Sequence, residues 1–272
     1  MKIKFYGTRG SLPVSGREFL DFGGNTTSIK ITRDNGRISI FDAGSGIRNL
    51  GKELINVGSQ QQELFIAFSH FHWDHIQGFP FFAPAYSSNM VINLLCMGYD
   101  KEITNLEEIF ITQMNEEYFP VPLKSMGATF NFLQMDENEL QINNATISVI
   151  KQNHPGGSYG YRMEDNGKSI VICTDIEHGN SVLPEIVEFC KNADLLVHEA
   201  QYTNEELESH KGWGHSSYDQ AIEVAERAGV KKLAITHHDP DHNDVFLSEI
   251  ERECQKRYPD CVLARDNMEI NF

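Results

Sequence analysis

The sequence is poor in positive charge. Its 272 residues include 23 Lys and Arg against 39 Asp and Glu, which gives a formal net charge of −16. Binding along a nucleic-acid backbone depends mainly on Lys and Arg side chains that neutralise successive phosphates. A long nucleic-acid partner is therefore disfavoured. A small anionic substrate is still compatible with this charge, because bound divalent cations can make one pocket positive within an acidic protein.

Long apolar runs and paired cysteines are also missing. No segment has the apolar length that crosses a bilayer, and the stretch MKIKFYGTRGS lacks the apolar core of a signal peptide. We therefore expect a cytoplasmic protein without membrane association. The five cysteines are widely spaced and form no C-x-x-C pair, which argues against a disulfide framework and against a thiolate zinc site. We expect all five to be buried free thiols.

Strand-like and helix-like segments alternate along the chain. Four short apolar runs, ELFIAFS, SIVICTD, ADLLVHEA and KLAITH, have the length and β-branched content of strands, and each leads into a polar group. The stretch SSYDQAIEVAERAG predicts a helix capped by Ser217 and Gln220 and ended by Gly229. Asn166-Gly167 predicts a hairpin. No linker or repeat divides the chain, so we predict a single α/β domain over 1–272, with buried sheets covered by helices.

The stretch SHFHWDHIQG follows the first of these runs and holds four side chains of metal-binding type: His70, His72, Asp74 and His75. In an extended segment His70 and His72 project to the same side and can reach one cation. Asp74 and His75 fall in the following turn and can reach a second cation. A lone histidine here would be an ordinary buried residue, but four such side chains within six residues indicate a metal site.

One short stretch cannot complete two metal sites, so further ligands must come from other strand ends. Three residues fit this requirement. His154 ends ATISVIKQNH, Asp175 ends SIVICTD and His237 ends KKLAITH. A carboxylate beside apolar neighbours, as at Asp175, is costly to bury unless a cation or hydrogen bonds satisfy it.

Together these motifs resemble those of metallo-β-lactamase-fold hydrolases, specifically the phosphodiesterase branch. That branch includes ribonuclease Z and cyclic-nucleotide phosphodiesterases, among them the anti-Pycsar enzymes. The resemblance covers nearly the whole chain through FDAG at 41–44, HFHWDH, NHP, CTD and THH. It implies a four-layer αββα fold with two mixed sheets between helices, and an extra segment at about 97–134. It also implies a homodimer.

The resemblance implies two bound divalent cations. Zinc is the first expectation, with manganese or iron as alternatives, because imidazole and carboxylate ligands suit all three. The implied ligands are His70, His72 and His154 for one cation, Asp74, His75 and His237 for the other, and Asp175 as a bridge between them. Asp42 would hold a ligand imidazole by a hydrogen bond. The alternative for Asp42 is an ordinary strand-end residue before a glycine turn.

Two more motifs support the resemblance to the phosphodiesterase branch. LLVHEAQYTNEE and GWGHSSYD resemble motifs of the phosphodiesterase branch, with Gln201 and Ser217 at positions where the family usually has Thr. They imply that His215 protonates or stabilises the leaving oxygen and that Glu199 sets its orientation and charge. A surface position for His215 is the alternative. Asp74 is expected to serve catalysis as well as metal binding.

Three other residues have less specific expectations. Arg9, in GTRGS, could bind a loop by hydrogen bonds or reach a phosphate. In ITHHDPDHND only His237 is expected to reach the metals. His238 and Asp239 are candidates for the rim of the pocket or for support behind the ligands, with hydrogen bonding inside their own loop as the alternative.

The combined prediction is a metal-dependent hydrolase acting on a small phosphodiester nucleotide. A 3′,5′-cyclic mononucleotide opened to the 5′-monophosphate is the first expectation, because the extra segment lacks the basic arm with which ribonuclease Z grips transfer RNA. The alternatives are a ribonuclease Z-like tRNA 3′-processing endonuclease, and a lactonase or thioesterase on the same metals. A non-catalytic nucleotide-binding module and a diiron redox enzyme are further alternatives.

Overall fold

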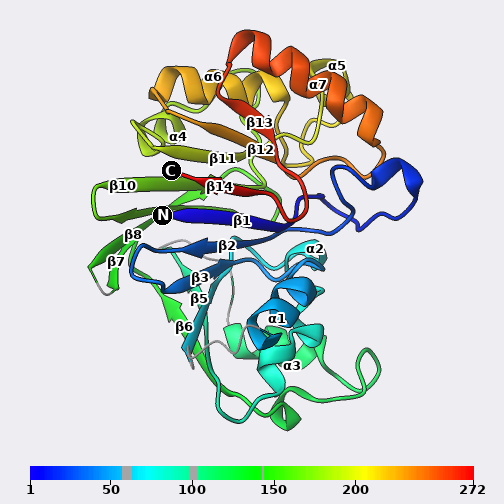
Figure 1. The fold of residues 1–272 in the computed structure, drawn as a ribbon, viewed down its shortest axis with the longest axis vertical. Coiled ribbons are helices and arrows are strands. Elements are labelled where there is room, and N and C mark those ends of the chain that lie inside the picture. Colours follow the sequence, from blue (N-terminus) through cyan, green and yellow to red (C-terminus); the bar gives the residue numbers. More distant parts are fainter. Residues whose placement is uncertain (57–62, 99–102, 104, 143) are drawn as a thin grey trace.

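Two seven-stranded sheets pack face to face in the computed structural model, which describes residues 1–56, 63–98, 103, 105–142 and 144–272 (Figure 1). In spatial order the first sheet consists of β14 (Glu269–Asn271), β1 (Lys2–Gly7), β2 (Ser28–Thr32), β3 (Ile38–Phe41), β4 (Glu63–Ala67), β5 (Val91–Met97) and β6 (Thr129–Met135). The second consists of β13 (Cys261–Leu263), β12 (Leu233–Thr236), β11 (Leu195–Glu199), β10 (Lys168–Cys173), β9 (Ser158–Asp165), β8 (Ala145–Gln152) and β7 (Glu139–Ile142).

Both sheets are mixed in the same way. Strands β3, β4, β5 and β6 pair in parallel, as do β10, β11, β12 and β13, whereas the other neighbours pair antiparallel. The carboxyl ends of parallel strands meet at one edge of a sheet, where α/β proteins usually place their ligands. Each sheet therefore contributes one such edge.

Helices cover the outer face of each sheet (Figure 1). The first sheet is covered by α1 (Ile47–Asn56), α2 (Trp73–Ile76) and α3 (Leu106–Gln113), together with short 3-10 turns at Phe79–Phe81, Ala83–Tyr86 and Leu123–Ser125. On the second sheet lie α4 (Pro184–Phe189), α5 (Asn204–Ser209), α6 (Tyr218–Ala228) and α7 (Asp244–Arg257). A further 3-10 turn spans Arg17–Phe19.

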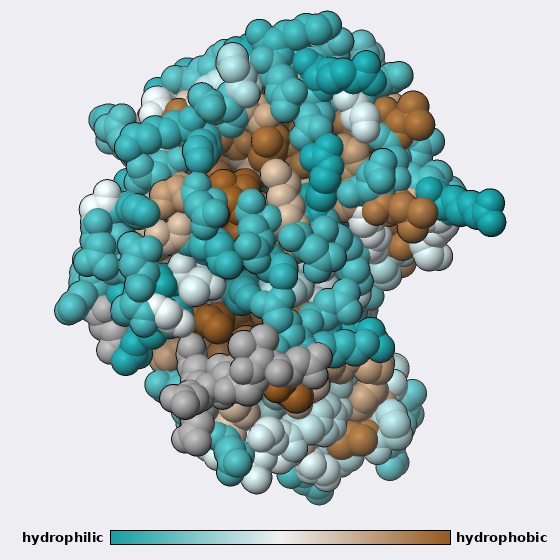
Figure 2. Space-filling view, viewed as in Figure 1, coloured by the Kyte–Doolittle hydropathy of each residue, from teal (hydrophilic) through white to brown (hydrophobic). Residues whose placement is uncertain are grey.

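Three apolar cores correspond to the three interfaces between these four layers. The central core joins the sheets and includes Phe5, Phe41 and Tyr161. The other two lie between each sheet and its helices. The outside is mainly polar, and Figure 2 shows a face on which hydrophilic side chains predominate and apolar ones appear in scattered places. Among the described residues, no helix has both the length and the apolar character that would let it cross a membrane.

The predicted four-layer α/β fold is confirmed. The four apolar runs form β4, β10, β11 and β12, and Asn166-Gly167 forms the turn between β9 and β10, with φ of 53° and 75°. Ser217 and Gln220 form a reciprocal capping box at the start of α6, and Gly229 ends the helix in the left-handed conformation. All five cysteines are buried and unbridged. In the predicted extra segment 97–134, residues 99–102 and 104 lie outside the described part of the chain, and the remainder includes α3 and most of β6.

Candidate functional site

The carboxyl ends of the parallel strands in both sheets converge on one buried cluster of polar side chains. Asp42 follows β3, the segment 69–75 follows β4, Asp175 follows β10, Glu199 ends β11 and His237 follows β12. These positions are the polar strand endings that the sequence predicted. Among the described residues, four overlapping groups of side chains are close enough to hold a metal ion, and two of these groups contain the predicted ligands. The other two groups each include His215.

Three of the strand-end residues have an unusual backbone conformation. Asp42, Asp175 and His237 have φ of 57°, 59° and 62°. This left-handed region is uncommon for residues with a side chain, and it is found in tight turns and at functional sites. At each of the three positions the chain turns sharply as it leaves the sheet and delivers the side chain into the cluster.

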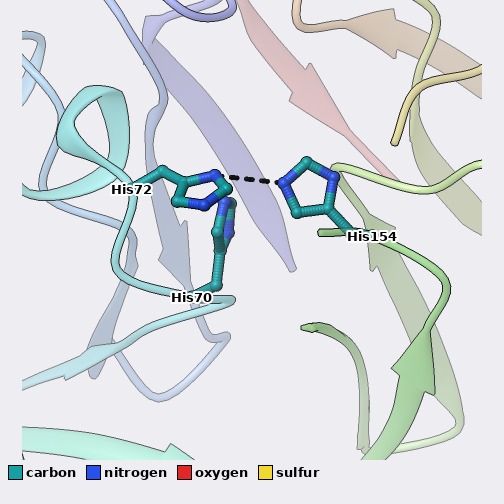
Figure 3. A group of neighbouring side chains, drawn as sticks. All are labelled: His70, His72 and His154. Carbon is teal, nitrogen blue, oxygen red and sulfur yellow. Dashed lines mark hydrogen bonds between the residues drawn. The ribbon is translucent and has the colours of Figure 1, made fainter. Parts of the chain in front are cut away.

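The first group consists of His70, His72 and His154 (Figure 3). His70 and His72 come from the segment after β4, and His154 comes from the turn between β8 and β9. Nε2 of His154 lies 3.1 Å from Nδ1 of His72, and the ring of His70 lies 4.4 Å from that of His72 between centroids. His72 is exposed while the other two are buried, so this group faces solvent on the His72 side.

The second group consists of Asp74, His75, Asp175 and His237, all of them buried. Nε2 of His75 lies 3.2 Å from a carboxylate oxygen of Asp74 and 3.2 Å from one of Asp175. Nε2 of His237 lies 3.2 Å from Asp74 and 3.3 Å from Asp175.

Asp175 lies between the two groups. Its Oδ1 is 3.8 Å from Nε2 of His70 and 3.9 Å from Nε2 of His154, whereas its Oδ2 faces His75. The carboxylate therefore faces ligand-type nitrogens from both groups. This is the position that a bridging carboxylate would occupy.

Two imidazole nitrogens at the centre of the cluster have no hydrogen-bond partner among the described residues. These are Nε2 of His70 and Nε2 of His75, and both are buried. Buried polar atoms normally make hydrogen bonds, so these two nitrogens, which face carboxylates without a hydrogen bond, call for a further partner. Imidazole and carboxylate together are donors that suit divalent transition metals. The residues therefore fit two cations.

The charges in the cluster also favour bound cations. Burial disfavours the charged form of His75, yet Asp74, Asp175 and Asp42 together raise its pKa well above its usual value. Burial would also raise the pKa of the Asp175 carboxyl, but His237, His75 and His70 lower it well below its usual range. The Asp175 carboxylate thus stays ionised inside the protein and attracts positive charge.

Asp42 and Ser69 hold the second group from behind. Nδ1 of His75 donates to Oδ2 of Asp42 at 2.8 Å, which leaves Nε2 of His75 facing the cluster. The backbone N–H and the hydroxyl of Ser69 both donate to Asp42, each at 2.8 Å. The structure therefore places Asp42 in hydrogen-bond contact with the imidazole of His75.

Two backbone groups from distant parts of the chain also contact ligand-type side chains. Nδ1 of His154 donates to the carbonyl of Gly214 at 2.9 Å, so its Nε2 faces the first group. The N–H of Ser11 donates to Oδ2 of Asp74 at 2.9 Å. Neither contact was predictable from the sequence, because a backbone group leaves no signature in residue type. The role of Ser69 was not predicted either, although this residue directly precedes His70.

His215 and Glu199 lie at the edge of the cluster. Nδ1 of His215 is 3.7 Å from Glu199, which is longer than a hydrogen bond. The fully buried Glu199 carboxylate instead accepts the N–H groups of Ile176, Gln201 and Ser216 at 3.2, 3.1 and 2.7 Å. Glu199 therefore holds the backbone beside His215 in place and also places a negative charge near the His215 ring.

The His215 ring faces both groups. It stacks on the ring of His237 at 5.1 Å and lies 5.4 Å from that of His154. Burial lowers the pKa of His215, but Glu199, Asp175 and Asp74 together outweigh this effect and raise the pKa above its usual value. An imidazole that can carry a proton therefore lies against the His/Asp cluster.

Arg9, His238 and Asp239 lie behind the cluster. The fully buried Arg9 guanidinium donates to the carbonyls of Gly23, Asp239 and His242, which is the loop role rather than the phosphate-binding role among the two expected. Nε2 of the buried His238 pairs with the carbonyl of Ala264, and Asp239 accepts from Gln201. These contacts stabilise the loop that begins at His237.

Comparison with known proteins gives one family and several relatives. The family described as the β-lactamase superfamily domain matches residues 39–238. A ribonuclease Z from Picrophilus torridus is 24% identical, and the match covers 99% of this chain and 95% of that protein. Because such relatives are ribonucleases, the expectation that a long nucleic acid is disfavoured finds no support in these comparisons.

Solved structures give the same fold. The metallo-β-lactamase-fold protein YhfI from Bacillus subtilis matches with a TM-score of 0.70 at 18% identity, over 99% of each chain. A diphosphatase from the PhnP family matches with a TM-score of 0.69 at 18% identity, over 100% of this chain and 97% of that one. Similarity at this level of identity shows the fold.

Proposed function

Because the chain belongs to the β-lactamase superfamily and is a hydrolase with the metallo-β-lactamase fold, we propose that it is a metal-dependent phosphodiesterase. Its first expected substrate is a 3′,5′-cyclic mononucleotide, opened to the nucleoside 5′-monophosphate. The observation that carries the proposal is the His/Asp cluster with His215 at its edge, since a protonatable imidazole beside two cation positions suits the departure of an alkoxide.

The ligand roles follow from the two groups of side chains. His70, His72 and His154 would hold one divalent cation, Asp74, His75 and His237 would hold the second, and Asp175 would bridge them. Zinc is the first candidate, and manganese or iron are alternatives. When bound, two such cations lower the pKa of a shared water towards neutrality and neutralise charge on the phosphoryl oxygens.

The rest of the site orients these side chains. Asp42 accepts the Nδ1 proton of His75, and Gly214 accepts that of His154, so each ring turns its Nε2 towards the cluster. The Ser11 N–H fixes one oxygen of Asp74. With its ligands held in place, the cluster need not reorganise when the substrate binds.

His215 is the proposed general acid. Its raised pKa means that the protonated form is more abundant near neutral pH than for a free histidine. The proton would pass from the ring to the oxygen that leaves phosphorus. Glu199 then stabilises the cationic ring before transfer and holds the Ser216 backbone next to it.

A small substrate is favoured over RNA because of the net charge of −16. The main second candidate is a ribonuclease Z-like tRNA 3′-processing endonuclease, favoured by relatives of that name that match nearly the whole chain. A lactonase or thioesterase on the same metals is a weaker candidate, because a general acid aimed at a phosphoryl leaving group is not needed for those reactions. The homodimer and the cytoplasmic location stay predictions. Light scattering would test whether the protein is a dimer in solution.

One experiment tests the proposal directly. Metal content is measured by mass spectrometry, and turnover is then measured with zinc or manganese on cyclic mononucleotides, cyclic dinucleotides, bis(p-nitrophenyl) phosphate, a lactone and precursor tRNA. We expect about two cations per chain and turnover of a small phosphodiester. Absence of turnover on every phosphodiester with either metal would refute the proposal.

The role of His215 has its own test. His215→Ala should lower kcat on a cyclic nucleotide by about a hundredfold to ten-thousandfold, while metal content stays the same. Activity at the wild-type level would remove the general-acid assignment. The deficit should be smaller on bis(p-nitrophenyl) phosphate, because nitrophenolate leaves without a proton.

A further inference from the structure

A cavity of about 220 Å³ opens directly beside His70 and His72. Beyond these two imidazoles, its walls include the side chains of Phe71, Met97, Ile103 and Tyr159. Because His70 and His72 belong both to the first ligand group and to the cavity wall, a molecule bound at the cluster has direct access to this space.

The fold builds the cavity where the two sheets meet. Met97 ends β5, Tyr159 lies at the start of β9, and Phe71 lies in the segment that follows β4. The Tyr159 N–H donates to the carbonyl of Ser69 at 3.0 Å, which joins the second sheet to the metal-ligand segment. The wall is therefore fixed relative to the ligand side chains.

A glycine beside the cavity fixes the Tyr159 ring. Gly98 has φ of 125°, and a Cβ at this position would lie 2.1 Å from Cε1 of Tyr159. Only glycine lets the ring come so close to the backbone. On another wall, Phe71 packs on Phe68 with ring centroids 5.5 Å apart, so its ring is also supported from behind.

The chemistry of the wall selects a neutral occupant. Among the described residues that line it, none is Lys, Arg, Asp or Glu. A second phosphate buried here would find no charged partner among the described lining residues, which makes its burial costly. A flat neutral ring would instead bury apolar area and stack on aromatic side chains, as bases do on aromatic residues in nucleotide-binding proteins.

We propose that this cavity binds the neutral aromatic part of the substrate, a nucleobase or an aryl group, while the phosphodiester lies at the His/Asp cluster. This inference rests on the proposed phosphodiesterase function and specifies its substrate class. The ring in the cavity belongs to the group that stays on phosphorus, as the base does when a cyclic nucleotide opens, and not to the leaving group. The proposal therefore implies a preference for diesters whose retained group carries a ring. Substrates that must place a second phosphate in the cavity are disfavoured.

The test fills the cavity with a larger side chain. Ile103 is half-buried and lines the cavity, whereas Ile111 is 43% exposed on α3 and does not line it. Ile103→Trp therefore places an indole in the cavity, and Ile111→Trp is the matched control on the surface. KM and kcat are measured for bis(p-nitrophenyl) phosphate and for methyl p-nitrophenyl phosphate, which share a leaving group and differ in one ring.

We expect Ile103→Trp to raise KM for the bis-aryl diester by about tenfold to a hundredfold, because one stacked ring contributes roughly 1–3 kcal/mol. The methyl diester should be hydrolysed as by the wild type, which also shows that the variant is folded and loaded with metal. Ile111→Trp should resemble the wild type on both diesters. An unchanged KM for the bis-aryl diester in Ile103→Trp would overturn the proposal.

A binding measurement separates this inference from the proposed function. Saturation-transfer NMR on metal-free protein with adenosine should give signals from the base protons for the wild type and Ile111→Trp, and much weaker signals for Ile103→Trp. If the metal-loaded wild type hydrolyses none of the phosphodiesters of the panel, the phosphodiesterase proposal fails, and these spectra still test whether the cavity binds the base. Absence of base-proton signals with the wild type would overturn the cavity assignment.

Discussion

Replacing Gly214 by alanine should remove a metal ion without touching a ligand residue. Gly214 has φ of 91°, and its carbonyl accepts the Nδ1 proton of His154. An added Cβ would lie 2.1 Å from Nδ1 of His154 and 2.4 Å from Cδ of Pro155. No real Cβ contact is that short, so the loop or the imidazole must move.

The size of the movement follows from these distances. Ordinary contact begins near 3.4 Å, so the Cβ and the His154 ring must separate by a further 1.3 Å. Nε2 of the same ring lies 3.1 Å from Nδ1 of His72 and belongs to the first ligand group. A misplacement of about 1 Å at a reacting centre can cost about a hundredfold in rate. We expect Gly214→Ala to lose about one cation per chain and about a hundredfold in kcat.

Gly212→Ala is the matched control. Gly212 lies in the same loop with φ of 85°, and a Cβ there would meet nothing within 4 Å. Both variants strain the backbone by roughly 1–2 kcal/mol, because alanine is disfavoured in the left-handed region, but only Gly214→Ala pushes on His154. Metal content, turnover and thermal midpoint are measured for both. Full metal content and wild-type turnover in Gly214→Ala would refute the argument that Gly214 fixes His154.

Three further predictions concern the metals and the acid range. Asp175→Ala should lose both cations and nearly all activity, and a variant with full metal and full activity would contradict the bridging role. Chelation should lower the thermal midpoint, and zinc at about 100 times its Kd should restore about 2.7 kcal/mol of stability; a midpoint insensitive to metal would argue against a resident site. His178, buried against His198 with ring nitrogens 3.2 Å apart, has its pKa lowered to about 3 by burial and by that neighbour. The unfolded chain therefore binds the proton first, and stability that is full above pH 6.5 should fall as the pH drops towards 3, by up to about 1.4 kcal/mol per unit. Urea unfolding at pH 7.5 and 5.5 should show a smaller loss for His178→Gln, and an equal loss would contradict this origin.

Local signals made much of the fold and the ligand groups predictable. The capping box at Ser217 and Gln220, the turn at Asn166-Gly167 and the apolar runs act over a few residues, so their physics is readable from the sequence. The polar residue after each buried strand is informative for a related reason. Each sheet brings the carboxyl ends of its parallel strands to one edge, and the two edges meet where the sheets pack together. His70 after β4 and Asp175 after β10 therefore lie close although they are far apart in the chain.

The supporting contacts were not predictable in the same way. The Ser11 N–H reaches Asp74 and the Gly214 carbonyl reaches His154 only because the sheets pack as they do. Any residue type has these backbone groups, so composition and spacing carry no information about them. In the stretch ITHHDPDHND, residue type is misleading. His238 and Asp239 are types that bind metals, but they stabilise their own loop through hydrogen bonds with Ala264 and Gln201.

At the strand ends, a residue must suit both the backbone conformation and the chemistry of the cluster. Asp tolerates the left-handed region better than most residues, so Asp42 and Asp175 meet the needs of the turn and of the cluster together. His237 occupies the same conformation with a bulkier side chain, and Gly10 packs so closely on its ring that a Cβ there would lie 2.3 Å from Nδ1. Asparagine or glycine would relieve the backbone at position 237, but neither offers an imidazole nitrogen to the cluster. Histidine, like aspartate, adopts the left-handed region more often than most residues. The uncommon backbone at position 237 therefore supports the prediction that this imidazole serves the cluster.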